Sequence, residues 1–469
     1  MFTLTLAGVL ACSFSAVGAT GPLKVHPTNP RYFADGTGKA VYLTGLHTWS
    51  NLKDMGKTDP PPAFDFSACL DFMQQYNHNF IRLWTWELSK YAYNESITYA
   101  HPFPWPRTGP GTALDGKPKF DLKKLNQDYF DRLRSRVVAA HDRGIYVSIM
   151  LFEGHGLHAS LAPWCWDGHP FNVNNNINGI DGDPDKDGRG IETQTLQIPA
   201  VTEIQEAYVR KIIDTVNDMD NVLYEIVNES GSYSTEWQYH VINFIHKYES
   251  GKPKQHPVGM TFQFARAEEH KGTNAALFAS PADWISPNPD GGYRDNPPAA
   301  DGSKVILSDT DHLWGIGGNQ AWVWKSFCRG MNPLFMDPYR RAQEDKRDVW
   351  TDHLSDKTDL DPEWEPIRRN LGYTLTYANR MDLASATPRN ELASTKYCLA
   401  NPGSEYLVYL PDGGEITVDL SAASGTLDVE WLNPDTGETT SAGTVSGGGS
   451  QKFNPPFDGD AVLYISINR

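Results

Sequence analysis

The stretch Asn221-Val-Leu-Tyr-Glu-Ile-Val-Asn-Glu229 is a short apolar run that ends abruptly in an amide followed by a carboxyl group. Upstream, Thr202-Glu-Ile-Gln205 has the form of a capping box, and apolar residues recur at helical spacing from there to Val216. A helix followed by a strand with an acid at its C-terminal end is the repeating unit of an α/β barrel, and barrel enzymes build their sites at that end. The stretch therefore predicts a (β/α)8 TIM barrel with Glu229 at its mouth.

Seven other stretches have the length and β-rich composition of barrel strands, at 41–49, 79–87, 145–153, 256–263, 284–288, 304–311 and 332–339. Helical patterns alternate with them, for example the apolar run that ends before Gly144. Together with 221–229 they make eight strands, and their alternation with helices predicts a closed parallel sheet. A small hairpin with its turn at Asp35 and Gly36 is expected around 32–43.

Beyond residue 385 the pattern changes to short alternating runs broken by turn dipeptides such as Asp412-Gly413. This pattern is typical of an antiparallel β-sandwich. We therefore expect a signal peptide over 1–19, the catalytic barrel with its hairpin over 20–385, and an accessory β-sandwich over 386–469. The first segment is predicted from an apolar run, Leu4 to Val17, that is followed by small residues.

Composition limits the classes of partner. Lys and Arg number 41 and Asp and Glu number 58, so the net charge of 41 − 58 = −17 argues against nucleic acid. After residue 19 no stretch has the roughly 18 apolar residues of a membrane span. We expect a secreted or periplasmic protein, and the sequence around Cys12 is similar to a lipoprotein cleavage box, which would add a lipid anchor. Four cysteines remain beyond residue 19 and fit disulfides or buried apolar positions equally well; the oligomeric state is left open.

Polar and aromatic side chains gather where the predicted barrel strands end. Aromatic residues make up 12 % of the chain, which suits stacking on sugar rings but also suits a large core. The residues expected to contact substrate are His47, Trp49, Arg82, Trp84, Trp86, Glu87, Glu153, His155, Asn228, His312, Trp314 and Asp337.

Two carboxyl groups on different strands would supply acid–base chemistry. Cleavage of an acetal needs a proton on the leaving oxygen and negative charge beside the oxocarbenium-like centre. Glu229 would supply the proton, and Asp309 or Asp311 would be the nucleophile, or the base if the reaction inverts. Strand alternation puts both Asp residues on one face, and Asp311 is preferred because it lies nearer the exit. The expected substrate is a poly- or oligosaccharide, with no cofactor required.

Two motifs resemble a known group of enzymes. Tyr224-Glu-Ile-Val-Asn-Glu229 and Arg82-Leu-Trp-Thr-Trp-Glu87 are similar to the clan A retaining glycoside hydrolases, the family 5 cellulase-like barrels. The resemblance implies that Asn228 binds the sugar 2-hydroxyl, that Glu229 is the acid/base and that Arg82 supports the nucleophile. The C-terminal part, with Val429-Glu-Trp-Leu-Asn-Pro-Asp-Thr-Gly437, is similar to the module named "putative collagen-binding domain".

The chain departs from the clan A pattern at the end of 304–311. Clan A enzymes place Glu there, whereas this chain has Ser308-Asp-Thr-Asp-His312, and Asp is one methylene shorter. Carboxyl groups about 5 to 5.5 Å apart favour retention and about 6.5 to 9.5 Å favour inversion, so both outcomes stay open. Two other interpretations remain: a catalytically silent barrel that binds carbohydrate at the cell surface, and a metal-dependent hydrolase that uses Glu153, His155 and His158.

An acidic loop after 145–153 resembles the first half of an EF-hand calcium loop. Asp181-Gly-Asp-Pro-Asp-Lys-Asp-Gly188 places acids at alternate positions before a glycine, and the predicted ligands of a structural calcium ion are Asp183, Asp185 and Asp187. Position 12 of the loop is Gln194 rather than Glu, so a solvated acidic turn also fits.

Overall fold

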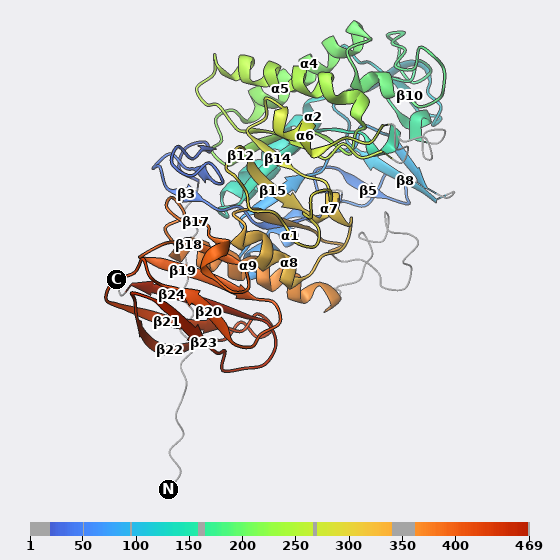
Figure 1. The fold of residues 1–469 in the computed structure, drawn as a ribbon. Coiled ribbons are helices and arrows are strands. Elements are labelled where there is room, and N and C mark those ends of the chain that lie inside the picture. The colour runs from blue at the N-terminus through green and yellow to red at the C-terminus, as the bar shows by residue number, and fades with distance from the viewer. Residues whose placement is uncertain are drawn as a thin grey trace.

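The computed structural model describes residues 19–49, 51–93, 96–157, 165–265, 270–339 and 362–467. Within these ranges a barrel is followed by an antiparallel β-domain, coloured from blue to red along the chain in Figure 1. Cys12, His158 and the predicted signal peptide up to residue 18 lie outside the described residues, so export and lipid anchoring stay predictions of the sequence.

Eight parallel strands form the barrel. They are β4 (Gly45–His47), β6 (Phe80–Leu83), β11 (Tyr146–Glu153), β12 (Val222–Asn228), β13 (Val258–Thr261), β14 (Trp284–Ser286), β15 (Val305–Asp309) and β16 (Asn332–Met336), paired in the order β4-β16-β15-β14-β13-β12-β11-β6. The ring closes between β4 and β6, where the Asn79 N–H donates to the Thr44 carbonyl at 3.0 Å. A Cβ at Gly45 would overlap the Phe80 carbonyl, so glycine permits this approach. All eight predicted strands are confirmed, each somewhat shorter than expected.

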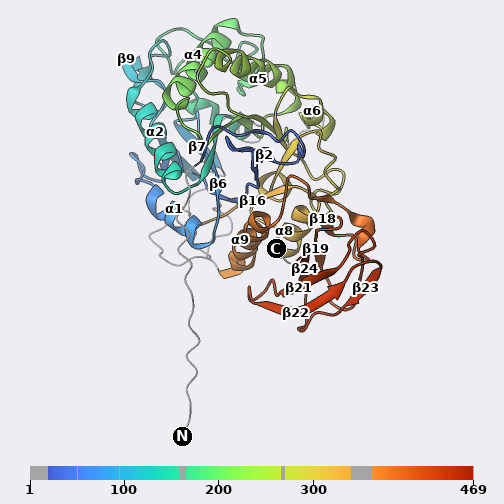
Figure 2. The same ribbon diagram turned by 90° about the vertical axis from the view of Figure 1, so that its left-hand side faces the viewer.

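Helices surround the sheet. They are α1 (Phe66–Gln75), α2 (Gln127–His141), α4 (Pro199–Val216), α5 (Thr235–Glu249), α6 (Asn274–Ala279), α7 (Thr310–Leu313), α8 (Gln320–Cys328) and α9 (Glu365–Arg380). In Figures 1 and 2, α2, α4 and α5 cover the barrel away from the C-terminal domain, whereas α8 and α9 lie between the two. The predicted start of α4 at the Thr202 capping box is wrong. The helix begins at Pro199, because proline suits the first helical position, and Ile198 is its N-cap.

Three small sheets accompany the barrel. The predicted hairpin is confirmed by β1 (Lys24–Val25), β2 (Phe33–Ala34) and β3 (Ala40–Val41). Val41 pairs with Phe33 in this hairpin, so the predicted start of the first barrel strand at Val41 is wrong. The other two sheets follow β4 and β6, at the mouth of the barrel. They are built from β5 (Asp54–Gly56), β7 (Lys90–Tyr93) and β8 (Ser96–His101), and from β9 (Arg107–Thr112) and β10 (Pro118–Phe120).

The C-terminal domain is a β-sandwich, as predicted. Six antiparallel strands pair in the order β17-β18-β19-β24-β21-β22, and β20 pairs with β23. Their bounds are β17 (Thr387–Pro388), β18 (Cys398–Asn401), β19 (Glu405–Leu410), β20 (Ile416–Asp419), β21 (Thr426–Leu432), β22 (Thr439–Ser446), β23 (Ser450–Phe453) and β24 (Ala461–Ile467). Alternating buried residues of these strands form their own apolar core.

A second apolar cluster joins the sandwich to the barrel. Trp324 on α8 stacks on Tyr409 of β19 with ring centroids 6.3 Å apart, and Phe327 and Tyr377 belong to the same buried cluster. At the rim, the Gln320 amide donates to carboxylates of the sandwich. Because this contact is apolar and buried, the sandwich braces the barrel.

Removal of residues 386–469 is therefore expected to make the barrel aggregate, because Trp324, Phe327 and Tyr377 would lose their cover. Size-exclusion chromatography of the expressed 1–385 chain measures this. A full-length Gln320→Ala protein loses only rim hydrogen bonds and should elute like the native protein. A soluble, monomeric 1–385 barrel would contradict the bracing role and favour an independent binding module.

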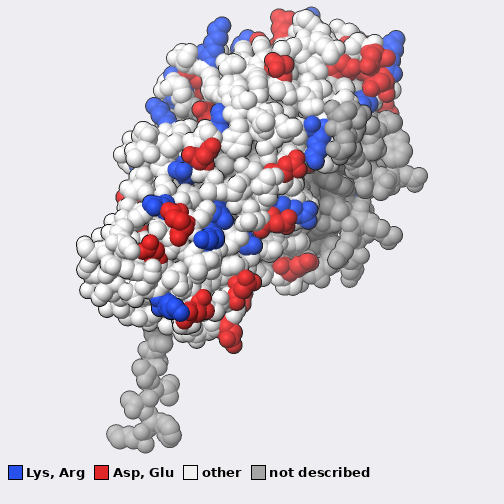
Figure 3. Space-filling view, in the orientation of Figure 1, with Lys and Arg blue, Asp and Glu red and all other residues white. Residues whose placement is uncertain are grey.

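The cysteines of the described residues, Cys69, Cys165, Cys328 and Cys398, are all buried and so serve as apolar core residues. Among the described helices, none combines the length and apolar composition that a membrane span requires. Figure 3 shows acidic and basic side chains interspersed over one face of the molecule.

Candidate active site

Arg82, in β6, is the centre of a buried network at the barrel mouth. Its Nε and Nη2 donate to the two carboxylate oxygens of Glu225, at 2.8 and 2.6 Å. Its Nη1 donates to Asp309 Oδ2 and to Asp311 Oδ2, both at 3.0 Å, and its Nη2 also donates to Asn228 Oδ1 at 3.0 Å. One guanidinium thus faces three carboxyl groups, and only 2 % of its side chain is exposed. The network fixes groups from β6, β12 and β15 in one arrangement.

Asp309 is the last residue of β15 and the N-cap of α7, where its Oδ1 accepts the Asp311 N–H at 3.0 Å. His47, at the end of β4, places its Nε2 2.9 Å from the same oxygen. Burial alone would raise the pKa of Asp309, but the electrostatic effects of His47 and Arg82 outweigh it and hold that pKa below its usual range. Asp309 is therefore a fixed carboxylate with 1 % of its surface exposed.

Asp311 lies beyond the strand, in the first turn of α7. The predicted strand 304–311 is wrong in its last two residues, because Asp309 caps a helix there. Strand alternation therefore does not relate the two Asp residues, but both side chains reach the same Arg82 nitrogen. Burial raises the pKa of Asp311, and the negative charge of Asp309 raises it further. Arg82 lowers this pKa but offsets only part of the increase, so the pKa of Asp311 lies above its usual value. Asp311 retains 7 % exposure, more than Asp309.

His312 lies beside these carboxylates as a neutral imidazole. Burial, with a smaller effect of Arg82, lowers its pKa to about 3. Its Nδ1 lies 2.7 Å from Ser286 Oγ of β14, and its Nε2 lies 3.7 Å from Asp311 Oδ2. The ring thus forms part of the wall around Asp311.

Glu229 follows β12 directly and has a left-handed backbone, with φ of 48°. A non-glycine residue in this region costs about 1–3 kcal/mol, and such residues cluster at active sites. Its side chain is 14 % exposed, and Oε2 lies 3.8 Å from His155 Nε2. Glu153 holds that histidine in place, since its carboxyl accepts the His155 N–H at 2.7 Å and the Gly156 N–H at 3.2 Å. The mouth thus contains a partly exposed acid directly after β12 as well as the carboxylates of Asp309 and Asp311.

Two further carboxyl groups at the mouth are neutral near pH 7. Burial raises the pKa of Glu87 to about 8 and that of Glu153 to about 8. Glu87 Oε2 accepts the Glu153 N–H at 3.2 Å, which ties the segment after β6 to the end of β11. Lys53, also buried, donates to the Trp86 carbonyl, and burial lowers its pKa well below its usual value. The protonated carboxyl groups of Glu87 and Glu153 can offer hydrogen bonds without adding charge.

The aromatic candidates differ in exposure. Trp49, Trp84 and Trp86 are each 1 % exposed and pack in one apolar cluster, so they support the site rather than present a face to a sugar. Trp84 lies under Arg82, with the guanidinium carbon 5.0 Å from the ring centroid. Trp314 is partly exposed beside α7 and keeps an accessible surface.

Asp337, at the end of β16, has a structural partner. Its carboxylate accepts hydrogen bonds from Arg368 of α9 at 2.6 and 2.7 Å, and both side chains are fully buried. This ion pair ties α9 to the barrel. The predicted substrate contact of Asp337 is thus replaced by a packing role.

Sequence reasoning missed several members of the site. Glu225 holds Arg82, Ser286 holds His312, and Lys53 lies beside Glu87. Glu225 had a usable signal, because a carboxyl inside an otherwise apolar strand needs a buried donor. The other two carry no local pattern that marks them.

The acidic loop keeps two of its three predicted ligands together. Asp183 and Asp185 lie with Glu192 in a group whose ligand atoms are all within 4.8 Å of one another. Asp187, predicted as the third, is not a member of the group, and its Oδ2 lies 4.0 Å from Arg189 Nη1. Glu192 takes the place predicted for Asp187 because the chain turns back at Gly188 and Gly190, both with positive φ. The short helix η3 (Ile191–Gln194) then places Glu192 next to the loop.

The fold and the site together define a (β/α)8 barrel with an acidic centre at the C-terminal ends of its strands, braced by a β-sandwich. Residues 386–465 match the family model "Putative collagen-binding domain of a collagenase", and residues 96–264 match "Domain of unknown function (DUF6298)". No curated protein matches the chain in sequence.

Solved structures show the same architecture over nearly the whole chain. One described as a glycoside hydrolase is 14 % identical, with a TM-score of 0.60 and coverage of 96 % of this chain and 97 % of that one. A glycoside hydrolase family 5 protein from Bacteroides vulgatus is 14 % identical, with a TM-score of 0.60 and coverage of 95 % and 94 %. A "putative glycoside hydrolase" from the same organism is 11 % identical, with a TM-score of 0.61 and coverage of 95 % and 82 %. These structures confirm the resemblance to family 5-like barrels at the level of the fold. The family model that matches residues 386–465 confirms the resemblance of the C-terminal part to the putative collagen-binding domain.

Proposed function

We propose that this protein is a glycoside hydrolase that cleaves O-glycosidic bonds of poly- or oligosaccharides by a retaining double displacement. The observation that carries the proposal is the Arg82 network, which joins Asn228, the neighbour of Glu229, directly to the carboxylates of Asp309 and Asp311. An acid and a carboxylate on separate strands around one sugar site are what glycoside hydrolysis requires. The similar structures described as glycoside hydrolases support the same class of reaction.

In the proposed reaction Asp311 attacks the anomeric carbon while Glu229 protonates the leaving glycosidic oxygen. This step forms a covalent glycosyl–enzyme ester and releases the first product as an alcohol. Water then attacks the same carbon, Glu229 takes its proton, and the bond to Asp311 breaks. His155, 3.8 Å from Glu229 Oε2, orients that acid, and Arg82 stabilises the departing Asp311 carboxylate.

The choice of Asp311 over Asp309 rests on their surroundings. Asp309 Oδ1 is engaged by His47 and by the Asp311 N–H, and Oδ2 by Arg82, so its lone pairs are committed to the protein. Asp311 accepts a hydrogen bond from Arg82 through Oδ2 and is the more exposed of the two. Asp309 is therefore assigned the role of a fixed negative charge that positions Arg82 and His47.

A pH profile tests this division of roles. Asp311 must be ionised to attack, so activity falls as the pH drops through its raised pKa. Asp309→Asn removes a neighbouring negative charge that shares Arg82 Nη1 with Asp311. The pKa of Asp311 should therefore fall, and the acid limb of kcat/KM should move to lower pH. Asn is also a good N-cap, which preserves the start of α7. Asp142→Asn, at an exposed position on the barrel surface, is the control and should leave the profile in place. An acid limb that stays in place or moves upward in Asp309→Asn would contradict the assignment.

A further inference from the structure

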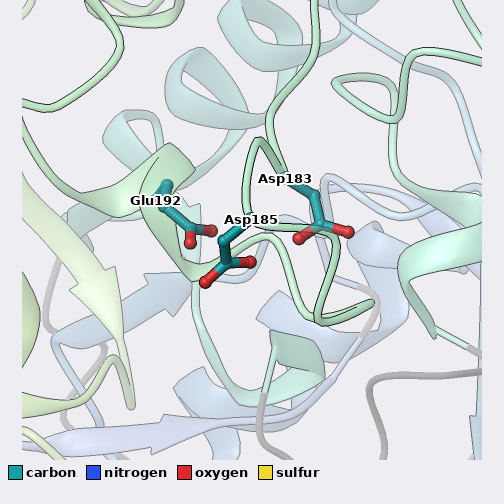
Figure 4. A group of neighbouring side chains, drawn as sticks. All are labelled: Asp183, Asp185 and Glu192. Atoms are coloured by element: carbon teal, nitrogen blue, oxygen red, sulfur yellow. The ribbon is translucent and has the colours of Figure 1, made fainter.

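The loop between β11 and α4 brings together three carboxyl groups that play no part in the proposed reaction. Asp183 and Asp185 come from the loop itself and Glu192 from η3. In Figure 4 the Asp185 carboxyl group lies between those of Glu192 and Asp183. Oxygens bound to one calcium ion at about 2.4 Å lie at most about 4.8 Å apart, and the ligand atoms of this group fit within that limit.

Two of these side chains are buried with an oxygen that lacks a hydrogen-bond partner. Glu192 is 6 % exposed and its Oε2 has no partner; Asp183 is 8 % exposed and its Oδ1 has none. A buried carboxyl oxygen without a donor is costly, and a buried charge is normally paired or bound to a metal. The unpartnered oxygens favour a cation site over a solvated acidic turn.

We propose that Asp183, Asp185 and Glu192 bind one structural calcium ion. Carboxylate oxygens are the ligands that a hard cation prefers, and an irregular loop suits calcium because that ion tolerates flexible geometry, whereas magnesium demands a near-ideal octahedron. The ion stabilises the fold of the loop and does no chemistry. The proposal is independent of the reaction assigned to the barrel mouth.

The loop is linked to the mouth through packing and one hydrogen bond. Two residues after Glu192, the Gln194 amide donates to the Glu153 carbonyl at the end of β11, at 2.9 Å. Gly190 lies against the Trp166 ring so closely that a Cβ would overlap it, and that ring packs 4.9 Å from His169. His169 Nε2 lies 3.9 Å from Glu87. Calcium bound at Glu192 therefore stabilises one wall of the barrel mouth.

Isothermal titration of CaCl2 into the full-length protein, after dialysis against EGTA, tests the site. We expect saturable binding of one ion per chain, weakened about tenfold or more in Glu192→Gln, because affinity follows the number of charged ligands. Asp187→Asn is the matched control, since it removes one acid of the same loop outside the group, and its affinity should stay within about twofold of native. Calcium should also raise the melting temperature of the native protein more than that of Glu192→Gln.

Asp185→Asn is a second variant for the case in which Glu192→Gln fails to fold. Asp185 is exposed, so its replacement should leave the fold intact. It should weaken calcium binding as Glu192→Gln does. The proposal is overturned if CaCl2 gives no saturable binding at millimolar concentration, or if MgCl2 binds more tightly. Equal weakening by Asp187→Asn and Glu192→Gln would also overturn it, because that result indicates a diffuse acidic surface.

Discussion

Replacement of Glu229 by Gln is expected to lower kcat/KM on glycosides with poor leaving groups by about 10²- to 10⁴-fold, the usual contribution of a general acid. The amide keeps the size of the side chain but has no proton to give. Activated aryl glycosides carry leaving groups that depart without protonation, so their first step should lose far less. Steady-state kinetics on a matched pair of substrates, one unactivated and one a dinitrophenyl glycoside, measures the difference.

Glu203→Gln is the control for this experiment, because Glu203 is exposed on α4 and lies outside the barrel mouth. It should leave both substrates unaffected. An equal loss on both substrates in Glu229→Gln would mean that Glu229 binds the sugar rather than protonating the leaving oxygen.

Replacement of Asp311 by Ala is expected to lower activity by at least about 10⁴-fold, the order seen when a catalytic nucleophile is removed. The missing carboxylate leaves space for a small anion next to Arg82. Sodium azide should therefore restore turnover of an activated glycoside and give a glycosyl azide of inverted configuration. NMR of the product identifies both the compound and its anomeric configuration.

Asp309→Ala is the matched comparison for this second experiment. It should lose activity through a misplaced Arg82 and His47, yet azide should not restore it, because no nucleophile is missing. Rescue of Asp309→Ala instead of Asp311→Ala would assign the nucleophile to Asp309. Rescue of neither, with native activity retained, would remove both from the chemistry.

The barrel could be predicted from the sequence because its signals are local. Each strand is a short apolar run, and Glu229 directly follows one of them, so its place at the mouth follows from strand order alone. The strand ends could not be predicted in this way, since Asp309 caps α7 and thereby ends β15 two residues before the predicted end. Capping depends on a few hydrogen bonds that composition does not reveal.

Partners that are distant in sequence could not be predicted in the same way. Asp337 has the position of a site residue, but its ion pair with Arg368 forms only when α9 packs on the barrel. Glu192 lies outside the spacing of the EF-hand pattern and reaches the acidic loop because two glycines turn the chain back. The sequence also could not distinguish buried from accessible tryptophans. Trp84 and Trp86 are buried below the mouth, whereas Trp314 is partly exposed.

The most direct test of the central claim is a screen of the purified full-length protein and its Glu229→Gln variant against plant, algal and bacterial polysaccharides. Products are followed by mass spectrometry and binding by affinity electrophoresis. The account predicts that the native protein releases oligosaccharides or sugars from at least one glycan, and that Glu229→Gln binds the same glycan without releasing product. Binding by both proteins with no product from either would contradict the account and identify a silent, carbohydrate-binding barrel.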